Sequence, residues 1–145
     1  MKNHVDLMNS FLRGEIAAVE TYRQAIAKVG DASTRMQLEH CRRSHQERVN
    51  LLRDRILRLG GTPADGSGMW GTFAKLVEGG AKVFGDKAAI DCLEEGEDHG
   101  LKDYRTHLNE LDTNDRFFVE QELLPGQVET HSAMSTLKHE VHIHG

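Results

Sequence analysis

The chain has 145 residues, of which 28% are charged and 38% are hydrophobic, and its formal net charge at pH 7 is −5 with histidine neutral. This length fits one domain and allows a core of the size found in helical bundles. With only two prolines, the composition favours solvated helices over a sandwich of short strands. Acidic residues are mixed with basic ones, so we expect no nucleic-acid partner.

The cysteines and the length of the apolar runs indicate the cellular compartment. Cys41 and Cys92 lie inside helical patterns and lack the spacing of a disulfide framework or a zinc pair. No apolar stretch reaches the length of a membrane span, and the N-terminal segment lacks the apolar run of a signal peptide. We therefore predict a cytoplasmic protein with no membrane partner.

Apolar residues recur every three or four positions over four segments, which is the pattern of amphipathic helices. The first helix is expected over 5–29, and the second begins near its expected cap Ser33 and ends at the Gly-Gly-Thr-Pro of 60–63. Asp86 is the expected cap of the third, which continues to about residue 111. The fourth begins near 113–115. Its expected inward seam is Phe117, Leu124, Val128, His131, Met134 and Leu137.

Two features of the connections set the topology. The loops after the first and third helices are short, whereas residues 61–85 form a long connection with a short helix expected between Trp70 and Val83. This predicts an all-α four-helix bundle, built of two antiparallel hairpins joined by a crossover, over residues 1–138. Pro125 should kink or interrupt the fourth helix. Residues 139–145 are expected to form a disordered tail rich in histidine.

A short pattern occurs twice in the chain. Residues 14–23 read GEIAAVETYR and residues 96–105 read GEDHGLKDYR, which predicts a duplicated helical hairpin. In each copy a glutamate, Glu15 or Glu97, precedes a tyrosine, Tyr22 or Tyr104, by seven residues. Seven residues are two helical turns, so both side chains should lie on the same apolar face.

A carboxylate on an apolar face needs a cation, a hydrogen-bond partner or a raised pKa. The helices that follow Glu15 and Glu97 supply His45 and His131 on their inward seams, and Glu94 lies one turn before Glu97. Imidazole and carboxylate are common ligands of iron and zinc. The sequence therefore predicts a core site for iron or another divalent metal, with a possible stress or redox role.

Two other interpretations of these residues stay open. The same side chains can form a metal-free hydrogen-bonded network that fixes helix register, in a protein that acts in assembly or partner binding. Arg48, one turn beyond His45, can pair with a seam carboxylate, which would argue for one metal ion or none. A third interpretation is a catalytic carboxylate with a raised pKa that needs no metal. The apolar residues of the long connection should pack either across the bundle or into a dimer partner, and we expect a homo-oligomer, a dimer.

The chain resembles the ferritin-like superfamily, and most closely a bacterial family of four-helix-bundle proteins of unknown function. The resemblance spans nearly the whole chain, and the end of the second helix is also similar to bacterioferritins. The segments that carry it are residues 14–15 and 22–23, LRDRILRLGGTP at 52–63, residues 84–87 and 96–100, and Leu-Leu-Pro at 123–125.

This resemblance implies a ferritin-like fold and a set of ligands for iron. In bacterioferritins and rubrerythrins, a glutamate on helices one and three joins a Glu-x-x-His on helices two and four to hold two iron ions. Glu15 and Glu97 match the first pair. His45 stands where the bridging glutamate would be, Arg48 stands where the histidine would be, and the fourth helix has no Glu-x-x-His before His131.

Overall fold

The computed structural model describes residues 4–68 and 85–144, with side chains as far as Val141. The short helix that we expected between residues 70 and 83 lies outside the described residues. Within the described part of the chain the secondary structure is entirely helical, as the composition predicted. None of the described helices is both long enough and apolar enough to cross a membrane.

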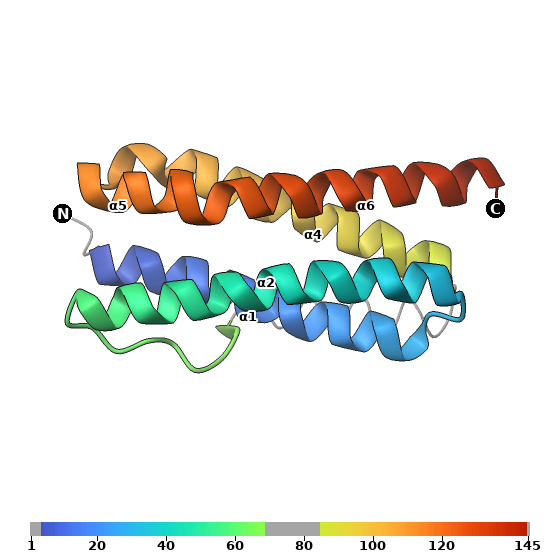
Figure 1. Cartoon of the computed structure of the whole chain (residues 1–145), viewed down its shortest axis with the longest axis horizontal. Helices are drawn as coiled ribbons and strands as arrows, with labels where there is room; N and C mark the ends of the chain where they lie inside the picture. The colour runs from blue at the N-terminus through green and yellow to red at the C-terminus, as the bar shows by residue number, and fades with distance from the viewer. Residues whose placement is uncertain (1–3, 69–84, 145) are drawn as a thin grey trace.

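The described residues form four helical units, whose arrangement Figure 1 shows. Helix α1 spans His4–Lys28, α2 spans Ala32–Arg58 and α4 spans Asp86–His107. The fourth unit consists of α5 (Thr113–Phe118), a π-helical turn η3 (Val119–Leu123) and α6 (Leu124–His144), and the 3₁₀ turn η2 (Leu108–Glu110) precedes it. Helix α1 packs on α2 and α4 packs on α6, so each helix lies against its neighbour in the chain. For the described residues, the predicted all-α class with four helical units is therefore confirmed, and their arrangement is consistent with a bundle.

The caps of two helices differ from the predicted ones. Asp31, not Ser33, is the N-cap of α2, and its side chain accepts a backbone hydrogen bond from the first turn. The cap of α4 is Gly85, whose φ of 82° falls in the region that glycine tolerates best. Asp86 instead accepts hydrogen bonds from the backbone N–H groups of Gly30 and Asp31. Its carboxylate therefore joins the α1–α2 loop to the start of α4.

Pro125 lies in the first turn of α6, directly after the π-helical turn η3. Proline removes a backbone donor and crowds the carbonyl four residues earlier, and the wider turn accommodates both effects. The predicted inward seam was wrong on either side of this turn, although Met134 and Leu137 were placed correctly. Phe117 and Val128, expected inward, are 65% and 38% exposed. In the π-helical turn and α6, the buried residues are Val119, Leu123, Gln127, Thr130, Met134 and Leu137.

The end of the chain also differs from the prediction of a disordered tail. Helix α6 continues as far as His144 and includes most of the segment 139–145. Val141 packs against the hydrophobic cluster that contains Leu137, so apolar contacts extend into the predicted tail and support the helix there.

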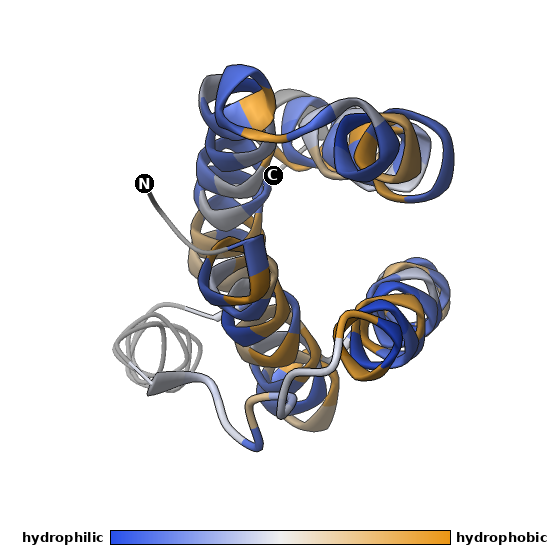
Figure 2. Ribbon diagram, turned by 90° about the vertical axis from the view of Figure 1, so that its left-hand side faces the viewer, coloured by the Kyte–Doolittle hydropathy of each residue, from blue (hydrophilic) through white to orange (hydrophobic). Residues whose placement is uncertain are grey.

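The interior contains two hydrophobic clusters, one toward each end of the bundle. The first includes Met8, Leu52 and Leu123, and the second includes Leu38 and Met134. Figure 2 looks along the bundle and shows the described helices around this interior. A group of buried polar side chains lies at mid-bundle, at the position where the sequence predicted a site.

Candidate functional site

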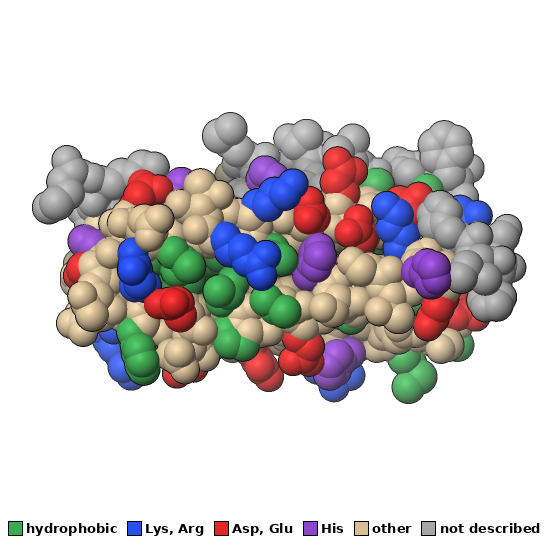
Figure 3. Space-filling model, turned by 90° about the horizontal axis from the view of Figure 1, so that it is seen from above, with side chains coloured by type: hydrophobic (Ala, Val, Ile, Leu, Met, Phe, Trp, Pro, Cys, Tyr) green, Lys and Arg blue, Asp and Glu red, His purple; other side chains and the backbone are tan. Residues whose placement is uncertain are grey.

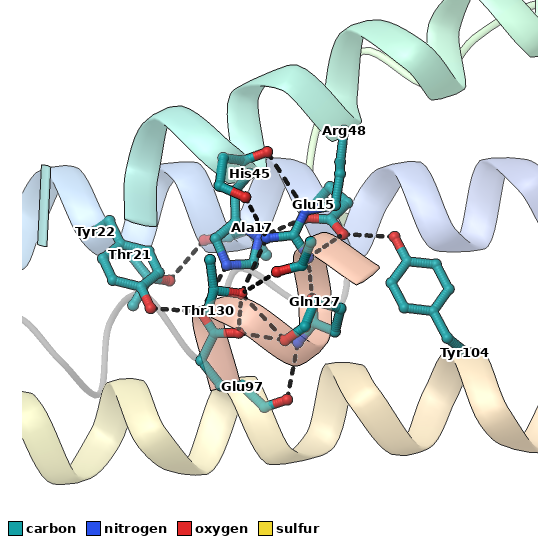
Figure 4. A network of polar contacts seen from close by, with 12 residues as sticks. Glu15, Ala17, Thr21, Tyr22, His45, Arg48, Glu97, Tyr104, Gln127 and Thr130 are labelled. Carbon is teal, nitrogen blue, oxygen red and sulfur yellow. Dashed lines mark hydrogen bonds and ion pairs between the residues drawn. The ribbon is translucent and has the colours of Figure 1, made fainter. Parts of the chain in front are cut away.

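A network of buried polar side chains joins all four helical units at mid-bundle (Figure 4). Each side chain is 3% exposed or less, so their charges are removed from bulk water. An unpaired ion in such a place would cost several kcal/mol, which makes their mutual contacts decisive. The members are Glu15 and Tyr22 of α1, His45 and Arg48 of α2, Glu97 and Tyr104 of α4, and Gln127 and Thr130 of α6.

His45 lies between the two repeated glutamates. Its Nδ1 is 2.5 Å from Oε1 of Glu15, and its Nε2 is 2.6 Å from Oε2 of Glu97. A carboxylate can only accept a hydrogen bond, so both ring nitrogens must donate and both must carry a proton. The ring in this arrangement is an imidazolium cation.

The two tyrosines donate hydrogen bonds to the two glutamates in a crossed arrangement. Tyr22 of α1 donates its hydroxyl to Oε2 of Glu97 on α4. Tyr104 of α4 donates to Oε2 of Glu15 on α1, over 2.5 Å. Each tyrosine thus contacts the glutamate of the other Glu-Tyr pair. The equal spacing within the two pairs lets both bonds form across the same interface.

Arg48 supplies the second buried cation. Its Nη1 lies 3.5 Å from Oε2 of Glu15, which confirms the expected pairing with a seam carboxylate. The same nitrogen donates to Oε1 of Gln127 over 2.5 Å, and Nη2 donates to the Thr130 hydroxyl over 3.1 Å. These contacts tie α2 to α6.

Gln127 and Thr130 are the members that the sequence analysis missed. Oε1 of Glu97 accepts a hydrogen bond from Nε2 of Gln127 over 2.9 Å and one from the Thr130 hydroxyl over 2.8 Å. A signal for them was present, because steps of three and four counted back from Leu137 and Met134 reach both positions. The predicted seam instead used Val128, one residue after Gln127, because valine is the more apolar residue.

The charges of the network cancel, since two carboxylates face one imidazolium and one guanidinium. Burial raises the pKa of Glu97, but the charge of His45 and the hydrogen bonds from His45 and Tyr22 outweigh it and lower the pKa to about 2. Burial likewise opposes ionisation of Glu15, and the charges of Arg48 and His45 hold its pKa below the ordinary value. Lowered pKa values contradict the interpretation of either glutamate as an acid with a raised pKa.

The pKa of His45 is raised for the complementary reason. Burial and the charge of Arg48 both disfavour the imidazolium, but the two carboxylates that flank the ring outweigh them. The protonated ring is thus the form that this environment stabilises.

The other two predicted ligands do not join the network. Nε2 of His131 lies 3.9 Å from Oε2 of Glu94 and 3.5 Å from Oδ1 of Asp98, in a partly exposed ionic cluster between α4 and α6. Thr130 occupies the inward position, and one further residue turns His131 about 100° away from the core. The structure brings together Glu15, His45 and Glu97 and separates His131 and Glu94 from them.

The donor set of the core does not fit the iron that a ferritin-like resemblance implies. Within the described part of the chain, Glu15, His45 and Glu97 do not offer three ligand atoms within 4.8 Å of one another. The imidazole ring separates the two carboxylates and uses one nitrogen on each. All four carboxylate oxygens already have donors, and the charges already cancel.

Two small hollows reach the network from the side between α1 and α4. Each has a volume of about 30 Å³, enough for one water molecule. Both are lined by Gly14 and Gly96. One hollow reaches Glu97 and the other reaches Glu15. Each hollow therefore has room for one water molecule beside a carboxylate of the network.

The fold and the site define a class of protein, a helical bundle whose core holds a charge-compensated network of glutamate, histidine, arginine and tyrosine. The chain belongs to the family described as Domain of unknown function (DUF2383), whose model matches residues 3–110. That match includes both glutamates and both core cations, while the fourth helical unit lies beyond it. A comparison with curated proteins and another with solved structures found no match.

Proposed function

We propose that this protein is a metal-free helical bundle that acts in assembly, and that its core network takes the place of a metal centre. The observation that carries the proposal is the bridge from Glu15 through His45 to Glu97. A cation is required between two buried carboxylates, and a protonated ring supplies it. The ferritin-like resemblance is then one of fold, with different chemistry at the centre.

A buried ionic network contributes more to specificity than to stability. Apolar residues of equal volume often stabilise a core as well as an ion pair does, because removing ions from water is costly. A network that needs donors from all four helical units, however, is satisfied in one register only. Its role in this proposal is to hold α1, α2, α4 and α6 in the arrangement that presents the outer surface.

An exposed apolar strip on the fourth helical unit is the surface that we assign to assembly. The strip consists of Phe117, Pro125 and Val128, with the partly buried Leu124 beside it. Hydrophobic side chains gather in one half of the face seen in Figure 3, toward the end of the bundle that carries α5. A second copy of the chain would bury this strip by a two-fold contact, in which the same patch meets itself.

The test compares the mass of the protein in solution with that of a charged variant. Phe117→Asp introduces charge into the strip at a side chain that is 65% exposed, so folding should change little. Met36→Asp is the matched control, since Met36 is 75% exposed on α2, outside the strip. Light scattering should give a dimer for the wild type and the control, and a monomer for Phe117→Asp. Equal masses for all three would refute the assembly surface.

The alternative is that the core holds iron or another divalent metal. His45 would then have to lose a ring proton, and the two carboxylates would have to break hydrogen bonds that they now accept. Elemental analysis after growth with added iron or manganese tests it. We expect the wild type and the variant Glu97→Gln, with folding of both checked by circular dichroism, to hold equal amounts of metal. The loss of about one ion per chain in the folded variant alone would overturn the metal-free account.

A further inference from the structure

A second group of ionisable side chains lies away from the core network, at the end of the bundle where α1 begins. His4 is the first residue of α1, Asp112 is the N-cap of α5, and Asp115 lies in the first turn of α5. Each of the three offers a ligand atom within 4.8 Å of those of the other two. The fold brings them together from distant parts of the sequence.

Two atoms in this group lack the hydrogen bonds that burial demands. Asp115 is 1% exposed, and its Oδ2 and Nδ1 of His4 are both buried without a hydrogen-bond partner. The two atoms are 3.0 Å apart, but they do not have the geometry of a hydrogen bond. A buried carboxylate oxygen left in this state costs free energy comparable to a lost hydrogen bond to a charged group.

We infer that His4, Asp112 and Asp115 form a binding site for a divalent metal ion of the first transition series. Two ligands that lie about 2.1 Å from one ion at right angles are about 3.0 Å apart. That value matches the separation of the unpartnered nitrogen and oxygen. One imidazole nitrogen with two carboxylate oxygens suits manganese, iron or zinc better than calcium or magnesium.

Arg55 of α2 holds the Asp115 carboxylate in place. Its Nε and Nη2 both donate to Oδ1 of Asp115, over 3.0 and 2.5 Å, which leaves Oδ2 turned toward His4. Donors on the outer oxygen of a ligand carboxylate commonly fix its orientation in metal sites. The two aspartates and Arg55 carry a net charge of −1 with His4 neutral, so the site attracts a cation.

Asp112 has one oxygen free for a ligand. Its Oδ1 accepts the backbone N–H of Asp115 over 2.8 Å, and its Oδ2 lies 3.9 Å from Nε2 of His4. The site would therefore join the first turn of α1 to the start of the fourth helical unit. A bound ion should hold these two parts of the chain together and raise the melting temperature, because it binds the folded state only.

The experiment measures binding of Mn²⁺ alone to the full chain by electron paramagnetic resonance, in which free and bound ions are distinguished. Asp112→Asn keeps an oxygen to cap α5 but removes the charge, and His4→Gln removes the imidazole. We expect both variants to bind Mn²⁺ at least about tenfold more weakly than the wild type. Their gain in melting temperature with Mn²⁺ should shrink as well.

Two control variants make the result specific. Asp54→Asn removes an exposed carboxylate that pairs with Arg58 on α2, outside the cluster, and should bind like the wild type. Glu97→Gln alters the core network and should also retain binding, which separates this site from the core. No Mn²⁺ binding by the wild type at millimolar concentration would overturn the inference. Equal affinity of the wild type, Asp112→Asn and His4→Gln would overturn it too.

Discussion

Glu97→Gln is the substitution that probes the core network most sharply. Oε2 of Glu97 accepts hydrogen bonds from Tyr22 and His45, and Oε1 accepts from Gln127 and Thr130. An amide has one acceptor oxygen and one donor nitrogen, so it can satisfy only one of these two sides. It also leaves the buried pair of cations with a single carboxylate.

Two estimates of the cost agree. Lowering the pKa of Glu97 from 4.5 to about 2 corresponds to about 3 kcal/mol in favour of the charged form, at 1.36 kcal/mol per pKa unit. Removing one partner of a buried ion pair costs roughly 3–5 kcal/mol in general. We therefore expect Glu97→Gln to lower the free energy of unfolding by about 3 kcal/mol.

Urea denaturation followed by circular dichroism measures this loss. With a slope of about 1–3 kcal/mol per molar urea, the midpoint should fall by about 1–3 M. Glu95→Gln is the matched control, because Glu95 is an exposed residue of the same helix, and it should stay within about 0.5 kcal/mol of the wild type. A Glu97→Gln variant as stable as this control would refute the reasoning.

Three further predictions concern the same network. Because the pKa of Glu97 is lower in the folded chain, its stabilisation is complete above pH 4.5 and is lost as the pH falls toward 2, so acid unfolding curves of Glu97→Gln should show a smaller loss than those of the wild type. Tyr22→Phe removes one donor to Glu97 and should cost about 1–3 kcal/mol in urea denaturation, and a cost below 0.3 would contradict the contact. Gly100→Ala places a Cβ 2.9 Å from Nε2 of Gln127 and should destabilise the protein by about 1–3 kcal/mol. The Cβ of Gly126→Ala meets other atoms only at 3.5 Å, so this variant should be more stable than the wild type by up to about 1 kcal/mol. Equal melting temperatures for the two variants would contradict this packing.

The sequence predicted the helices well because each carries a long apolar seam and ends at a glycine or a polar cap. It also predicted that Glu15, His45 and Glu97 would meet, since the repeated Glu-Tyr spacing places both glutamates on seams and His45 follows on the next one. Apolar periodicity is a strong signal when the helix is regular, and α1, α2 and α4 are regular over these positions.

The fourth helical unit was predicted less well, for a local reason. The π-helical turn at 119–123 adds a residue to one turn, so positions before and after it do not follow one regular period. After the turn, Met134 and Leu137 were placed correctly, but the apolar Val128 was preferred to Gln127, and His131 was preferred to Thr130. The group of His4 and Asp115 depends on contact between residues more than 100 positions apart in the sequence, which no local pattern encodes.

The pairing of charges in the core was also beyond the sequence. The spacing of the seam residues predicts that His45 lies at the same height along the bundle as the two glutamates. It does not show that each ring nitrogen contacts a different carboxylate. That detail decides between a histidine that binds a metal and a histidine that replaces one. It depends on side-chain rotamers set by the packing of four helices.

The protonation state of His45 tests the central claim most directly. Side-chain ¹⁵N nuclear magnetic resonance of the full chain, with His45→Gln to assign the signal, reports the proton on each ring nitrogen. The charge-compensated core predicts that most His45 rings carry protons on both nitrogens at pH 6.5, the ordinary pKa of histidine, because the pKa of this ring is raised. A neutral ring at that pH, or a ring nitrogen bound to a metal ion, would contradict it.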